Sequence, residues 1–214
     1  MNPRATGSTA RGLASLRELA AKQPDRERCD LCSAVLAERH QHLLDPRSRR
    51  LLCACDPCAI LFASGGETKY RRVPRDIRRL HSFNLTGQAW NSLGIPIGLA
   101  FIYFSSGSRQ VFAVYPSPAG PTESELDSEA WNEVVADNPV LARLAPDVEA
   151  LLINRMNGAQ EYFCVPLDEC YRLTGLVRKY WRGFSGGDEG WAQINDFFRS
   201  LNERSSRYEP APYA

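Results

Sequence analysis

The amino-acid sequence predicts an α+β protein in which a small N-terminal metal-binding module packs on an antiparallel sheet. Three observations carry this prediction. Two C-x-x-C pairs lie close together near the N-terminus. Two later segments each show a strand–turn–strand pattern followed by a proline and a helical pattern. A final segment, 189–203, places large apolar side chains on one stripe and is expected to form a helix that closes the core.

Length and composition limit the possible classes of protein. The chain has 214 residues and 43% apolar residues, enough for one ordinary domain with a small appendage. The longest apolar run, 95–104, is interrupted by Pro96 and Gly98, so no membrane span is predicted. Residues 1–12 lack the apolar stretch of a secretory signal. We therefore expect a cytoplasmic protein whose seven cysteines are thiols or metal ligands.

The pattern along the chain divides it into four parts. Residues 1–27 are predicted to be a disordered N-terminus with a short helix, and residues 28–66 the four-cysteine module. Residues 67–204 are predicted to form the α+β domain, and residues 205–214 an extended tail. Within the module, residues 40–53 show the pattern of a β-hairpin.

The α+β domain has the signature of an internal repeat. Phe112 and Phe163 are 51 residues apart, as are Val114 and Val165, although any two adjacent hairpin–helix units share such a layout. Two units would give a four-stranded antiparallel sheet with helices on one face. The predicted elements are strands at 99–104 and 110–115, a proline-rich loop, a helix at 125–137, strands at 148–155 and 160–165, and a helix at 168–181. The predicted core residues are Phe101, Tyr103, Phe112, Val114, Leu152, Phe163, Val165, Trp181, Trp191 and Phe197.

The cysteine pairs are the most specific motif in the chain. The x-x spacing brings two sulfurs close enough to bind one ion, and a hairpin between the pairs would complete a tetrahedron. We expect Zn²⁺, with Fe as the alternative, either as a rubredoxin-type single iron or as an iron–sulfur cluster. Rubredoxin-type turns carry a glycine soon after the second cysteine, a position taken here by Ser33 and Ala59. The predicted ligands are Cys29, Cys32, Cys55 and Cys58.

The order of elements favours a treble clef over a zinc ribbon. A treble clef follows its first cysteine turn with a hairpin and then a helix whose first turn carries the second pair. The apolar run Ala-Ile-Leu-Phe after Cys58 has helical character, and Asp56 and Pro57 suit the start of a helix. A zinc ribbon would place the second pair on another hairpin.

Three further residues near the pairs are candidate ligands or neighbours of the metal. Cys53 is two residues before Cys55 and is expected on the same face, as a substitute ligand or a free thiol beside the metal. His40 and His42 are predicted to lie at the surface or next to the metal ligands, with direct binding of the metal by one of them as the alternative. Histidines beside paired cysteines also suggest an HNH-type nuclease, but that family's asparagine and helix histidine are missing from this sequence.

Charge is distributed unevenly along the chain. The first 82 residues carry 16 Lys and Arg against 9 Asp and Glu, whereas the remaining residues carry 10 against 16. Two oppositely charged segments either attract each other or face different partners. The near-neutral total argues against a dedicated nucleic-acid binder. The candidate partner-binding residues are a run of arginines, namely Arg71, Arg72, Arg75, Arg78 and Arg79.

Several segments together resemble a known family. They are CDLC, RHQHLLD, RRLLCACDPCAILF, YPSPAGPTES, NPVLARLAPDVEALLINR and DECYRLTGLVRKYWRGFSGG, and the resemblance as a whole covers about 29–201. The chain resembles a bacterial family of unknown function that is encoded beside actinobacterial-type nickel–iron uptake hydrogenases. The resemblance implies a role in the assembly, maturation or electron transfer of such a hydrogenase, with a hydrogenase subunit or maturation factor as partner.

These observations favour a non-catalytic metal-binding accessory protein. No P-loop, dinucleotide fingerprint, nucleophile elbow or zinc-protease motif is present, so we expect no catalytic and no cofactor-binding residues beyond the metal ligands. The alternatives are a rubredoxin-like one-iron electron carrier and a vestigial HNH-type nuclease.

Overall fold

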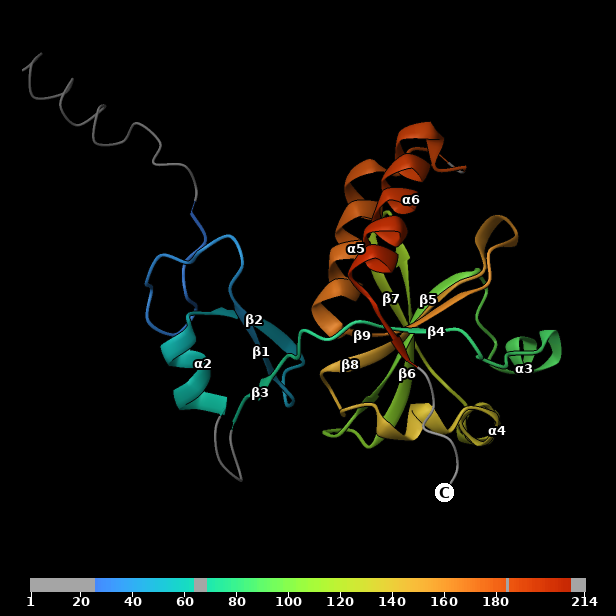
Figure 1. Ribbon diagram of the computed structural model, residues 1–214, viewed down its shortest axis with the longest axis horizontal. Helices are drawn as coiled ribbons and strands as arrows, with labels where there is room; N and C mark the ends of the chain where they lie inside the picture. The colour runs from blue at the N-terminus through green and yellow to red at the C-terminus, as the bar shows by residue number, and fades with distance from the viewer. Residues whose placement is uncertain (1–25, 64–68, 184, 209–214) are drawn as a thin grey trace, which may run out of the picture.

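The computed structural model describes residues 26–63, 69–183 and 185–208, and within them the chain is mixed α+β with two sheets (Figure 1). The helix and disorder expected before residue 26, and the tail beyond residue 208, lie outside the described residues. Among the residues that the structure describes, no helix is both long and apolar enough to cross a bilayer.

The N-terminal module contains the smaller sheet. Strands β1 (Gln41–Asp45) and β2 (Arg50–Ala54) form the predicted antiparallel hairpin, and β3 (Arg71–Arg72) adds to β1 on its other side. Helix α2 (Asp56–Ala63) begins directly after Cys55. Side chains alternate between the two faces of the hairpin. The face that carries Leu43 and Leu52 packs in the core of the module.

The larger sheet has seven strands in the order β10-β4-β9-β8-β5-β6-β7. Neighbouring strands are antiparallel except for β10 and β4, which run parallel. The prediction of two hairpins in one antiparallel sheet is confirmed, and the sheet has three strands more than expected. The strands are β4 (Arg78–Leu80), β5 (Leu99–Ser105), β6 (Gln110–Ser117), β7 (Gly120–Glu125), β8 (Glu149–Asn154), β9 (Glu161–Pro166) and β10 (Ser206–Tyr208).

Helices cover both faces of this sheet, which corrects the prediction of helices on one face (Figure 1). Helices α5 (Leu167–Tyr180) and α6 (Gly187–Arg204) pack on one face. Helices α3 (Gly87–Ser92) and α4 (Ser128–Asp137), with the 3-10 turn η1 (Pro139–Arg143), pack on the other.

The two hairpin–helix units therefore differ in three dimensions. If the two units were related by a two-fold axis normal to the sheet, the axis would exchange the antiparallel strands β5 and β8. The helices that follow the two units would then lie on the same face of the sheet. Helix α4 lies on the opposite face from α5, so the duplicated-unit architecture does not extend to the helices. The strands alone keep the correspondence, since Val114 and Val165 face the same core cluster.

The proline-rich segment forms a strand where a loop was predicted. Strand β7 pairs with β6 along its length, with Pro121 opposite Pro116. It lies at the edge of the sheet, where a missing backbone donor is tolerated. Four of its last five residues are polar and all five are exposed, which explains why the sequence gives no strand signal here.

The predicted core residues divide by burial. Phe101, Tyr103, Val114, Leu152, Phe163, Val165 and Phe197 are buried in the cluster under α5 and α6. Phe112, Trp181 and Trp191 pack against that cluster and are partly buried.

The module and the sheet domain meet along the hairpin. Leu44 of β1 is a buried member of the core beneath α5, and Leu51 of β2 packs against it. At the tip of the hairpin, Arg49 donates to the Glu123 carboxylate at 2.7 Å and lies over the Phe112 ring. The turn between β5 and β6 also touches the turn between β1 and β2, because a Cβ at Gly107 would lie 2.9 Å from the Pro46 carbonyl oxygen. The β1–β2 hairpin thus contributes to the core of the module and to the core beneath α5.

Candidate metal centre

Four cysteine sulfurs converge between the first loop of the module and helix α2. The Sγ atoms of Cys29, Cys32, Cys55 and Cys58 all lie within 4.8 Å of one another. Those of Cys32 and Cys55 are 3.6 Å apart. Zinc–sulfur bonds of about 2.3 Å at tetrahedral angles place sulfurs about 3.8 Å apart. The structure therefore brings together the four predicted ligands at spacings that suit one tetrahedral ion such as zinc or iron.

The first cysteine pair sits in a tight backbone turn. Ser33 has φ of 62°, a left-handed conformation directly after Cys32. The turn is closed by two backbone hydrogen bonds, from Ser33 N to Cys29 O and from Cys29 N to Ala34 O, each 2.8 Å. These bonds fix the two sulfurs on the same side of the turn.

The second pair is held differently, at the start of a helix. Strand β2 ends at Ala54, and the Cys55 carbonyl accepts from Ala59 N at 2.9 Å as α2 begins. Cys58 follows in the first turn of α2 and is buried. The two pairs thus reach the same point from a loop and from a helix.

The electrostatics of the metal-free thiols favour ionisation at one sulfur. Burial of Cys29 opposes its ionisation, but backbone amides of Cys55, Leu31 and Cys32 that donate to the sulfur outweigh burial and lower its pKa to about 6. Burial and hydrogen bonds with the other thiols raise the pKa of Cys58 to about 12. Four thiolates at one point need a cation to compensate their charge, which is the role of a bound metal.

Cys53 does not lie among the four sulfurs. It is the cross-strand partner of His42, and Cys53, His40 and His42 form a separate group whose ligand atoms lie within 4.8 Å of one another. The expected shared face of Cys53 and Cys55 assumed that the strand continued. Because β2 ends at Ala54, the alternation stops there and Cys55 turns to the other group.

The two histidines are fixed by hydrogen bonds through the same ring nitrogen. His42 Nδ1 donates to Asp168 Oδ2 at 2.7 Å, which joins β1 to the first turn of α5. His40 Nδ1 donates to the Ala37 carbonyl at 3.0 Å. Asp168 is 126 residues from His42, so no local pattern in the sequence pointed to this contact.

The arginine run contacts the protein's own side chains and backbone. Arg71 pairs with the buried Asp147 at 3.0 Å, and Arg78 pairs with the buried Glu149 at 2.6 Å. The remaining contacts are Arg72 to Gln41, Arg75 to the His40 carbonyl and Arg79 to Glu161. Three of the five arginines thus meet acidic side chains of the C-terminal part of the chain, which favours the intramolecular alternative.

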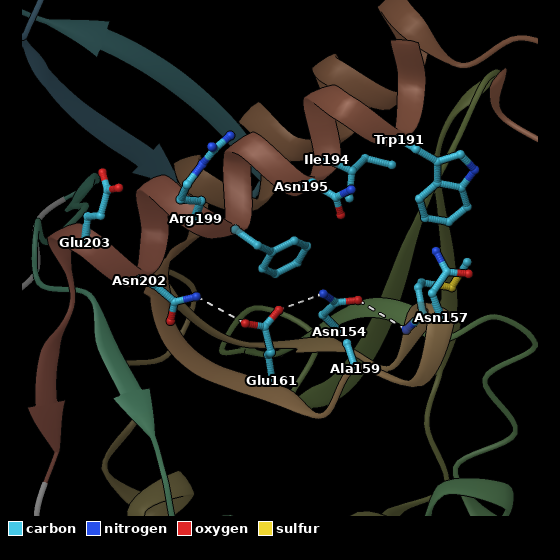
Figure 2. A pocket seen from close by; sticks show the side chains of 12 residues that line it. Asn154, Asn157, Ala159, Glu161, Trp191, Ile194, Asn195, Arg199, Asn202 and Glu203 are labelled. Atoms are coloured by element: carbon cyan, nitrogen blue, oxygen red, sulfur yellow. Dashed lines mark hydrogen bonds between the residues drawn. The ribbon is translucent and has the colours of Figure 1, made fainter. Parts of the chain in front are cut away.

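A polar cavity of about 480 Å³ lies between α6 and strands β8 and β9 (Figure 2). Glu161 points into it and accepts from Asn154 Nδ2 at 2.9 Å and Asn202 Nδ2 at 3.1 Å. Figure 2 shows Trp191 and Arg199 at its rim, on the α6 side. These residues come from three elements and formed no motif in the sequence. Glu161 is held by two amides, and the cavity has no paired nucleophile and base among its described residues.

The chain matches one family along most of its length. No curated protein and no solved structure matches it. The model of a family described as "Family of unknown function (DUF5947)" matches residues 28–205, which include the four-cysteine group and all strands of the larger sheet except β10. The chain therefore belongs to this family of unknown function.

Proposed function

We propose that the chain is a non-catalytic metal-binding protein in which Cys29, Cys32, Cys55 and Cys58 hold one structural Zn²⁺ in a treble-clef-like module. The observation that carries the proposal is the convergence of four sulfurs beside a very small core. Among the described residues, the core of the module has only three large buried aliphatic side chains, those of Leu36, Leu43 and Leu52. A segment of this size needs a further source of stability, and a bound ion supplies it.

The unequal presentation of the two cysteine pairs supports zinc over a rubredoxin-type iron. A rubredoxin-type site uses two similar turns, each relaxed by a residue that tolerates a left-handed conformation. Here only Ser33 is left-handed, and its counterpart Ala59 lies within α2. A loop pair followed by a hairpin and a helix pair is the treble-clef arrangement.

A structural role fits the chemistry of this site better than catalysis does. Four protein ligands fill a tetrahedral zinc site and leave no position for a substrate or water. The nuclease alternative needs a metal-binding histidine on the helix, and α2, with the sequence DPCAILFA, has none.

The identity of the partner rests on the resemblance to a family encoded beside nickel–iron uptake hydrogenases. On that basis we propose that the protein assists the assembly, maturation or stability of such a hydrogenase in the cytoplasm. The apolar side chains of Ile60, Leu61 and Phe62 on α2 are exposed, at 58%, 72% and 45%. Contiguous exposed apolar residues are typical of protein-binding surfaces, and α2 is the element that the ion would hold in place.

Metal analysis of the purified full-length protein tests the metal. We expect zinc in the four-cysteine site, a colourless protein, and loss of this ion in Cys55→Ser. Replacement by Co²⁺ should give the intense sulfur-to-cobalt charge-transfer absorption of a four-thiolate site. A red or brown protein that contains iron would support the electron-carrier alternative instead.

Co-purification from the native host tests the partner. A tagged chain should recover hydrogenase subunits or maturation factors, and Leu61→Glu should reduce that recovery without loss of the metal. Glu129→Gln, an exposed change on α4, is the matched control. Recovery of no hydrogenase component by the wild-type chain would contradict the hydrogenase assignment and leave the structural-zinc assignment unaffected.

A further inference from the structure

We propose that His40, His42 and Cys53 form a second metal site, for one borderline divalent cation of the Zn²⁺ class, where the module meets helix α5. The three residues lie on one hairpin of the module. His42 and Cys53 are directly opposite each other on β1 and β2, and His40 precedes β1 by one residue. The contact between the two imidazole rings shows that His40 lies on the same side of the hairpin as His42. Their ligand atoms lie within 4.8 Å of one another.

Both imidazoles are held through Nδ1, which orients Nε2 as the nitrogen that could bind a metal. Each Nδ1–H donates a hydrogen bond, to the Ala37 carbonyl for His40 and to the Asp168 carboxylate for His42. In a neutral ring this leaves the lone pair on Nε2. A carboxylate that holds the far nitrogen of a histidine is the usual support of a metal ligand, because it fixes the ring and raises its basicity.

The environment of His40 is the strongest observation in favour of this site. Its side chain is only 7% exposed, yet Nε2 is buried without a hydrogen-bond partner. A buried acceptor without a partner lowers the stability of the folded protein. The His40 and His42 rings meet edge to face with centroids 4.8 Å apart, so the two imidazoles belong to one cluster. A cation at this point would use the orphaned lone pair.

The ligand set selects the class of cation. Two imidazoles and one thiolate are borderline to soft donors that suit Zn²⁺ and exclude Mg²⁺ and Ca²⁺, which prefer oxygen. Binding takes place with both histidines neutral and releases the Cys53 thiol proton to solvent. His42 is 25% exposed, so water can supply the fourth ligand. Three protein ligands and an open position distinguish this site from the closed four-cysteine site.

The position of the second site gives it a structural consequence. His42 belongs to the module, and Asp168 belongs to the first turn of α5 in the sheet domain. An ion on His42 strengthens its hydrogen bond to Asp168 because the bound ring becomes a better donor. Occupancy of the second site therefore tightens the contact between the two regions.

The test uses the reduced full-length protein loaded with ¹¹³Cd²⁺, and its result is read by NMR. We expect two bound ions per chain. One should show only sulfur ligands, and the other should couple to Nε2 of both His40 and His42. This measurement needs no substitution, so it separates the second site from the four-cysteine site directly. One bound ion, or two ions without coupling to either histidine, would overturn the proposal.

Variants measured by competition with a chromophoric chelator for Zn²⁺ sharpen the result. His40→Asn and Cys53→Ser should each lose the second ion and keep the first. His81→Asn, which changes the remaining histidine of the chain, is the matched control and should keep both. Asp168→Asn should weaken the second ion roughly 10- to 100-fold by loss of the carboxylate support. Retention of two ions with unchanged affinity in His40→Asn would refute the site even if the wild type binds two.

Discussion

The cysteine module and the sheet domain are stabilised in different ways. In the described residues, the core of the module holds seven buried residues, of which two are cysteines of the four-sulfur group. The sheet domain has separate cores on the two faces of its sheet, with large buried residues such as Phe101 and Phe163 on one and Ile102 and Leu151 on the other. Burial alone can hold the second region together, whereas the first, under the proposed function, is held by an ion.

The two regions contact each other through a shared apolar residue and through ion pairs. Leu44 belongs to the β1 strand of the module and to the core of the sheet domain. Around it, Arg49 pairs with Glu123 and Arg71 pairs with Asp147, so basic residues of the N-terminal third meet acidic residues of the rest. The uneven charge along the sequence is thus used at least in part within the molecule.

Removal of one cysteine ligand should have the largest effect. We expect Cys55→Ser to lose the four-cysteine ion and to unfold residues 28–63, because metal binding in such modules contributes about 10–16 kcal/mol. The seven-stranded sheet should persist. Backbone NMR or limited proteolysis of the full chain would separate the two outcomes, with Cys164→Ala, a buried cysteine of the sheet domain, as control. Loss of the same ion in Cys53→Ser but not in Cys55→Ser would contradict the ligand assignment.

A cavity in the core beneath α5 should have the opposite effect, namely a less stable sheet domain that keeps the four-cysteine ion. Phe163 is fully buried against Phe198, so Phe163→Ala should lower the free energy of unfolding by about 3–5 kcal/mol. Urea denaturation would measure this loss, and the metal content of the folded protein should not change. Release of the four-cysteine ion by Phe163→Ala under native conditions would show that the sheet domain, and not the ion, holds the module together.

The pair formed by Arg78 and Glu149 tests the arginine run. Glu149 is 9% exposed and also accepts from Ala145 N, so Arg78→Ala leaves a buried carboxylate without its cation. We expect a loss of about 3 kcal/mol in the free energy of unfolding. Adding Glu149→Gln should recover part of this loss in a double-mutant cycle. Unchanged stability together with weaker partner recovery would instead assign Arg78 to a partner.

The smallest effect is expected at the tip of the hairpin. The side chains of Arg49 and Glu123 are 42% and 32% exposed, so Arg49→Gln should cost only about 0.2–1 kcal/mol, and less at high salt. Thermal unfolding at two salt concentrations would measure it. A much larger loss would mean that the contact between the regions depends on this pair more than on burial of Leu44.

Local signals in the sequence predicted most elements and failed in identifiable places. The hairpin, α2 and the strands β5, β6, β8 and β9 follow from alternation, turn residues and helix-start residues such as Pro57 at the start of α2. Strand β7 was missed because its exposed edge position needs neither apolar alternation nor freedom from proline. The prediction of the covered face was wrong for α4. A repeat in the strands does not determine on which face of the sheet the following helix packs.

The sequence by itself determined the four-cysteine group, because the x-x spacing brings each pair of sulfurs together through local backbone geometry. It also determined the hairpin that separates the two pairs. Only the tertiary structure decided that Cys53 leaves this group and joins His40 and His42, since that depends on the residue at which β2 ends. The tertiary structure also decided that Asp168 supports His42 and that Arg78 meets Glu149. Contacts between residues so distant in sequence arise from packing of whole elements, which no local spacing encodes.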